Sequence, residues 1–146
     1  MRRLAIIAAS AALAAALPGC SGKAPQGESA ADAPAGAGKG SFFETEIAPV
    51  LQTTCATCHL TGIEAGGISL LPKNAIGMLV DVAAIEAPSL KRVVPGKPDE
   101  SYLVMKLEGT HVNHGGSGAQ MPFGAAPLPP ETIAKFRKWI AEGAKP

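Results

Sequence analysis

The chain has 146 residues, of which 47% are hydrophobic and 4% aromatic, with 13 basic side chains against 12 acidic ones. This balance lacks the basic excess of a nucleic-acid binder, so no nucleic-acid partner is expected. Three cysteines are too few for a disulfide scaffold, and their odd number needs an explanation. The composition also excludes a multi-span membrane protein and a chain that is disordered throughout.

Residues 1–19 have the pattern of an export signal. Arg2 and Arg3 precede an apolar run from Leu4 to Leu17. This run is shorter than the roughly 20 residues that a membrane-spanning helix needs. It therefore predicts a secretory signal rather than a permanent span.

The end of this run, Leu17-Pro18-Gly19-Cys20, resembles the lipobox of bacterial lipoproteins. The resemblance implies that Cys20 is lipidated and becomes the first residue of the mature chain. Two acyl chains there would anchor the protein stably on the periplasmic side of a bacterial membrane, inner or outer. The alternative is cleavage near Ala14–Ala16, which leaves Cys20 as a free thiol.

Residues 20–40 then combine the lipidated N-terminus with a linker. Ala, Gly, Pro and Ser dominate this segment, and no apolar period defines a face that could join a core. We expect a flexible tether. Residues 41–146 remain as one small domain.

The domain opens with a predicted helix that leads into the main motif. Ser41 and Glu44 have the spacing of a capping box. Apolar residues follow at helical spacing, at Phe43, Ile47, Val50 and Leu51. Pro49 predicts a kink or a restart within the segment.

The motif is Cys55-Ala56-Thr57-Cys58-His59, the attachment signature of c-type haem. Residues three apart lie on one side of a helical turn, so the thiols of Cys55 and Cys58 can reach the two vinyl groups of one haem. His59 follows at once and is positioned as the proximal iron ligand.

Two other interpretations of the motif are open. A thioredoxin-like redox pair requires a βαβ surround, which the flanking sequence does not predict. Zinc could bind the two thiols with His59 and a later histidine. The export signal and the adjacent histidine favour haem over both.

A second axial ligand is expected from Met121. It ends a Gly-rich loop and is followed by Pro122, which stiffens the backbone beside it. The competing candidates are Met78, Met105, His111 and His114. The two methionines fall in apolar, helix-like stretches where Met usually fills a core, and the two histidines flank a polar loop. Ligation by two histidines therefore stays open.

Two further helices are predicted. One runs from Asp99 to Leu107 and ends before Gly109, and the last runs from Pro130 to about Glu142. The last helix has an apolar face with Trp139 beside it, which we expect to cover the haem or the helix crossing. That face consists of Ile133, Phe136 and Ile140. A basic cluster on the opposite side, Lys135, Arg137 and Lys138, is expected to be solvated.

Taken together, the domain resembles the class I cytochrome c family. The matching segments are residues 47–51, 55–59, 66–70, 94–98, 101–103, 121–122 and 139–144. The resemblance implies an all-α domain wrapped around one covalent haem c, with Cys55 and Cys58 as attachment sites and His59 and Met121 as axial ligands. The chain departs from the family pattern at Leu128-Pro129-Pro130, where such domains often have a Ser or Thr cap.

The expected function is a monohaem c-type cytochrome that carries single electrons between redox proteins outside the cytoplasm, and not an enzyme. Its partners would be met through small, transient interfaces. The alternative is a haem-based sensor or small-ligand binder with a labile sixth ligand. One cysteine is assigned to lipid and two to haem, so no disulfide is expected.

Overall fold

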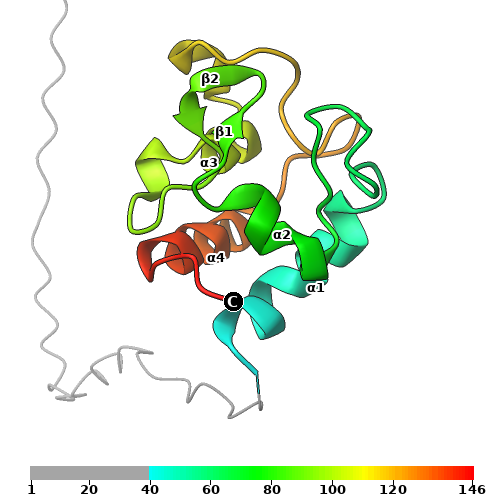
Figure 1. Ribbon diagram of the computed structural model, residues 1–146, viewed down its shortest axis with the longest axis vertical. Coiled ribbons are helices and arrows are strands. Elements are labelled where there is room, and N and C mark those ends of the chain that lie inside the picture. Colours follow the sequence, from blue (N-terminus) through cyan, green and yellow to red (C-terminus); the bar gives the residue numbers. More distant parts are fainter. Residues whose placement is uncertain (1–39) are drawn as a thin grey trace, which may run out of the picture. The chain divides into compact units, whose positions relative to one another are not determined.

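The computed structural model describes residues 40–146 (Figure 1). The interpretations that concern residues 1–39, namely the export signal, the lipidated Cys20 and most of the linker, lie outside the described residues. Within residues 40–146, no helix is both long and apolar enough to span a membrane.

The start of the first helix is fixed by the capping box that the sequence predicts. The backbone N–H of Ser41 donates to Oε2 of Glu44 at 2.8 Å, and the N–H of Glu44 donates to Oγ of Ser41 at 3.2 Å. Each side chain thus satisfies a backbone donor that the first helical turn leaves free.

Helical backbone then continues through Pro49 without a restart. A π-helix (Phe43–Ile47) passes into α1 (Ala48–Val50) and then into a second π-helix (Leu51–Cys55). Proline has no N–H to donate, and wide turns lie on both sides of this residue. The irregularity expected at Pro49 is therefore a change of hydrogen-bond pattern within one helical segment.

The rest of the domain is helical apart from one short hairpin. Its elements are α2 (Pro72–Leu79), β1 (Ala83–Ala84), β2 (Ala87–Lys91), a 3-10 turn (Pro98–Glu100), α3 (Tyr102–Glu108), a second 3-10 turn (His111–His114) and α4 (Pro130–Ala141). Strands β1 and β2 are antiparallel, with Ala83 opposite Lys91 and Ala84 opposite Ala87. The domain is thus a small helical domain with one two-stranded sheet, and the all-α prediction missed this sheet.

The helix expected over Asp99–Leu107 is divided at Ser101. The Ser101 hydroxyl is fully buried, accepts the Val94 N–H at 2.9 Å and donates to the Lys97 carbonyl at 2.8 Å. These bonds turn the chain between the 3-10 turn and α3. The predicted stop at Gly109 is confirmed, because Gly109 caps α3 in the left-handed region with φ 76°.

Two apolar clusters form the interior. The main one joins the first helix, α2, α3 and α4 through residues that include Phe43, Ile47, Leu51, Leu79, Leu107, Phe136 and Ile140. A smaller one lies between the hairpin and α3 and consists of Ala84, Ala87, Tyr102 and Met105. Trp139 packs on the ring of Phe43 with centroids 5.5 Å apart, and its Nε1 donates to the Lys145 carbonyl at 2.8 Å. Trp139 therefore covers the crossing of the first and last helices.

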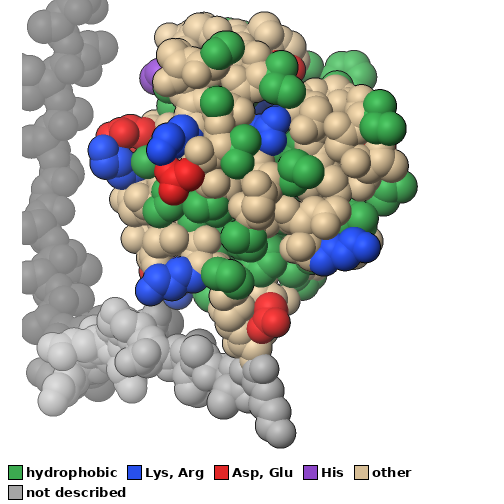
Figure 2. Space-filling view, in the orientation of Figure 1, with side chains coloured by type: hydrophobic (Ala, Val, Ile, Leu, Met, Phe, Trp, Pro, Cys, Tyr) green, Lys and Arg blue, Asp and Glu red, His purple; other side chains and the backbone are tan. Residues whose placement is uncertain are grey.

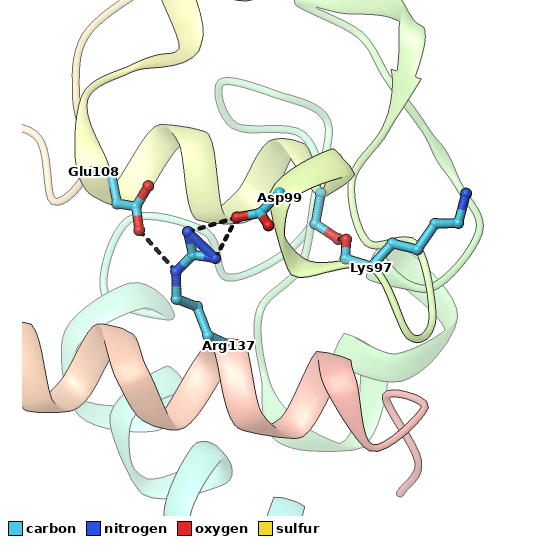
Figure 3. A network of polar contacts seen from close by, with 5 residues as sticks. Lys97, Asp99, Glu108 and Arg137 are labelled. Atoms are coloured by element: carbon cyan, nitrogen blue, oxygen red, sulfur yellow. Dashed lines mark hydrogen bonds and ion pairs between the residues drawn. The ribbon is translucent and has the colours of Figure 1, made fainter.

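The three side chains of the predicted basic cluster on α4 form ion pairs with acidic side chains of the domain. Arg137 donates through Nε to Glu108 at 3.0 Å and through Nη1 to Asp99 at 2.7 Å, which ties α4 to α3 and the preceding turn (Figure 3). Lys135 pairs with Glu46 at 2.8 Å, and Lys138 lies 3.9 Å from Glu142. These cations neutralise acidic groups of the same domain.

Candidate haem site

One tight turn brings together the three residues of the predicted attachment motif. Cys55 is the last residue of the second π-helix, and its carbonyl accepts the N–H groups of Cys58 at 3.2 Å and His59 at 3.0 Å. Both cysteines are free thiols. The turn therefore presents two thiols and an imidazole within five residues.

The two thiols lie in different surroundings. Cys55 packs against the main cluster, whereas Cys58 is exposed. Burial raises the pKa of the Cys55 thiol to about 11. The nucleophilic cysteine of a thiol–disulfide oxidoreductase has a lowered pKa instead, so the surroundings of Cys55 count against that interpretation of the motif.

The His59 ring is not engaged by the polypeptide. Its Nδ1 is buried and has no hydrogen-bond partner within residues 40–146, while its backbone carbonyl accepts the Leu70 N–H at 2.7 Å. Burying an unpaired polar group is costly, and within residues 40–146 the buried Nδ1 of His111 also has no partner. The backbone of His59 is thus held firmly while its imidazole remains available to a bound group.

The loop after His59 is closed by residues that the sequence analysis did not single out. Ser69 is buried, and its hydroxyl donates to the Leu60 carbonyl at 2.7 Å and accepts the Asn74 side-chain amide at 2.9 Å. Arg92 donates to the Gly66 carbonyl at 2.8 Å. No capping or turn motif in the sequence marks these bonds, and the partners Arg92 and Gly66 lie 26 positions apart.

Met121 borders the same main cluster as Cys55 and is half-buried. Its N–H donates to the Lys106 carbonyl at 2.9 Å, which fixes the end of the Gly-rich loop to α3. The structure therefore places the predicted sixth ligand and the first attachment residue on one apolar core.

The competing ligands lie in other environments. Met105 belongs to the smaller cluster and His114 is exposed. His111 is buried, with Nε2 3.0 Å from the Gly118 carbonyl and its ring edge-on to Tyr102. Met78, like Met121, borders the main cluster, so it is the competitor best placed to approach the same centre.

Large apolar side chains are uncovered on both segments that carry the predicted ligands. Ile63 is 91% exposed, Phe123 76% and Leu60 49%. A hollow of about 260 Å³ lies beside Met121 and is lined by residues of 119–127 that include Phe123. Exposed apolar side chains therefore lie within a few residues, along the chain, of the predicted thiol, imidazole and thioether donors, and an apolar haem could cover such groups.

A zinc centre fits the described residues less well. Within residues 40–146, no three side chains of His, Cys, Asp or Glu converge to hold a metal ion. Structural zinc sites need four such ligands.

In comparisons with known proteins, no family model, no curated protein and no solved structure matches the chain.

Proposed function

We propose that the protein is a membrane-tethered monohaem c-type cytochrome that carries single electrons outside the cytoplasm. The observation that carries the proposal is the turn at residues 55–59, which offers two unpaired thiols and an unengaged imidazole beside the main core. The helical domain and the placement of Met121 on that core support it. The resemblance of the sequence to the class I cytochrome c family also supports this proposal.

In this proposal each donor has a defined task. Cys55 and Cys58 would hold haem through their sulfur atoms, and His59 and Met121 would supply a nitrogen and a sulfur ligand to its iron. Bound haem supplies an iron that changes its charge by one electron. The thioether of Met121 favours the ferrous state and raises the reduction potential. With His59 and Met121 both bound to the iron, small ligands would be excluded, which would suit a carrier rather than an enzyme.

The distribution of charge on the surface supports short-lived interactions with redox partners. On the face shown in Figure 2, basic side chains are dispersed and several lie beside acidic ones. Dispersed charges give weak long-range steering. Redox proteins would therefore dock through short-range contacts of small area, as is usual for electron transfer.

The test is covalent haem attachment. The full chain is produced in a host with a c-type maturation system, denatured, and examined for haem that stays with the polypeptide. We expect retained haem in the wild type and none in the double variant Cys55→Ala/Cys58→Ala. A wild-type chain that releases all its haem on denaturation, or never acquires any, would contradict the proposal.

A haem-based sensor is the second candidate, because Met121 lies on a loop rather than within a helix. A sensor needs a sixth position that opens readily. Exposure of the reduced protein to carbon monoxide at neutral pH separates the two functions. Slow or incomplete binding supports the electron carrier, whereas rapid and complete binding supports the sensor.

A further inference from the structure

A buried ion pair lies directly under the loop that carries Met121. The Lys106 side chain is 8% exposed, and its Nζ lies 2.8 Å from Oε2 of Glu86, at the turn of the hairpin. The same carboxylate accepts the Tyr102 hydroxyl at 3.1 Å. Lysine is rarely buried unless it is paired, because its charge loses its hydration. Burying Lys106 therefore costs hydration free energy, which its ion pair with Glu86 and its other contacts must offset.

The ion pair holds the Gly-rich loop. Lys106 Nζ also donates to the Ser117 carbonyl at 3.0 Å. At Gly118, where φ is 77°, a Cβ atom would lie 2.9 Å from Oε1 of Glu86. The loop backbone thus lies against both members of the pair, and glycine permits this close approach.

Lys106 contacts the loop at a second point. Its backbone carbonyl accepts the Met121 N–H at 2.9 Å. One residue therefore fixes the middle of the loop through its ammonium group and the end of the loop through its carbonyl. Two further hydrogen bonds hold the Gly-rich loop. One runs from Gln120 Nε2 to the Leu107 carbonyl at 2.9 Å, and the other joins His111 Nε2 and the Gly118 carbonyl at 3.0 Å.

We propose that Lys106, held by Glu86, is the positioning residue that sets the Met121 thioether as a haem ligand. This inference rests on the proposed function, in which Met121 is the sixth ligand. A ligand on a loop is only as well placed as the loop itself, and side chains that orient a ligand from outside commonly tune its bond to the metal. His111 also holds this loop, because its Nε2 is hydrogen-bonded to the Gly118 carbonyl, and this contact is a role other than iron ligation.

The charge balance gives the inference a specific signature. Removing Lys106 alone leaves the Glu86 carboxylate partly buried without its cation, which is more disruptive than removing both charges. The double variant Glu86→Gln/Lys106→Met should therefore be less disturbed than Lys106→Met. Because the free energy of unfolding should follow the same order, the Fe(III)–sulfur band and the amide exchange at Met121 are the readouts that separate loop positioning from a general loss of stability.

The experiment uses the full, haem-loaded chain and compares Lys106→Met, Glu86→Gln and the double variant with the wild type. We expect Lys106→Met to weaken the long-wavelength Fe(III)–sulfur band and to speed carbon monoxide binding by roughly tenfold or more. Amide hydrogen exchange at Met121 should accelerate in parallel, and the double variant should recover part of each change. Glu86→Gln, which keeps the Lys106 bond to the Ser117 carbonyl, is the second variant if Lys106→Met does not fold.

Arg137→Met is the matched control, because it breaks an ion-pair network of the same domain that does not touch the loop (Figure 3). The control should leave the Fe(III)–sulfur band unchanged. The inference is overturned if Lys106→Met and Glu86→Gln keep the wild-type band and carbon monoxide rate, or if Arg137→Met weakens the band equally. A wild type without covalent haem instead overturns the proposed function, and with it this role of Lys106.

Discussion

The Leu70 N–H donates to the His59 carbonyl at 2.7 Å, so the predicted iron ligand is tied to a residue well beyond its own turn. The adjacent bond, from Ser69 Oγ to the Leu60 carbonyl at 2.7 Å, makes a double closure at the base of the loop. The backbone of His59 is therefore fixed from both sides, by the Cys55 turn and by this closure. Its orientation depends on residues outside the attachment motif.

Ser69→Ala tests this closure. The substitution leaves the Leu60 carbonyl and the Asn74 amide without their buried partner. We expect the free energy of unfolding to fall by about 1–3 kcal/mol, measured by denaturant titration. Ser89→Ala, at an exposed position of β2, is the control and should change it by less than about 0.5 kcal/mol. Equal losses in the two variants would show that the closure adds no stability.

Glu64→Gln tests the acid end of the same loop. Hydrogen bonds from its own backbone N–H, and from Thr61 and Gly62, lower the pKa of Glu64 from 4.5 to about 2. A carboxylate with a lowered pKa in the folded state stabilises the fold above its unfolded pKa, and this stability is lost as the pH falls toward the folded value. Wild-type stability should therefore decline between pH 4.5 and about 2 more steeply than that of Glu64→Gln. Denaturant unfolding at several pH values checks this, and parallel curves would contradict it.

Met121→Ala tests the sixth ligand. We expect the long-wavelength Fe(III)–sulfur band to vanish and the reduction potential to fall, because the thioether favours ferrous iron. Absorbance of the oxidised protein and a potentiometric titration measure the two effects. Met78→Ala is the control, since Met78 borders the same core. If Met78→Ala removes the band and Met121→Ala does not, Met78 is the ligand.

Cys20→Ala tests the tether. If Cys20 is lipidated and holds the chain on a membrane, as we propose, its removal should move the protein to the soluble periplasmic fraction. Fractionation followed by detection of the covalent haem measures the distribution. Ser21→Ala should stay with the membrane. A Cys20→Ala chain that also remains with the membrane would falsify lipid anchoring at this residue.

Features encoded by neighbouring residues were predictable from the sequence. The capping box of Ser41 and Glu44 depends on a spacing of three, and the stop of α3 depends on the left-handed conformation that Gly109 adopts readily. The last helix begins at Pro130, as predicted, and ends at Ala141, one residue before the expected position. The turn at Cys55 is likewise local.

Features that depend on distant partners were not predictable. The sequence places Lys106 on the inner side of its predicted helix, but its ion-pair partner Glu86, twenty positions earlier, has no sequence signal. The strands at residues 83–91 lack the alternating pattern of a half-buried strand, because β2 contains Pro88 and Ser89 on exposed positions. The bonds of Ser69 belong to the same class. The residues proposed to hold haem can therefore be named from the sequence, whereas the contacts around them cannot.

Arg92 carries a permanent charge into the interior of the domain. It is 8% exposed, its guanidinium donates to the carbonyls of Met78 and Gly66, and no ion pair within residues 40–146 involves it. Carbonyl dipoles solvate a cation without cancelling its charge. A fixed interior cation creates a positive electrostatic potential, which stabilises an added electron more than the electron-poor state. Arg92 thus biases any redox centre of this domain toward reduction, in the same direction as a thioether ligand.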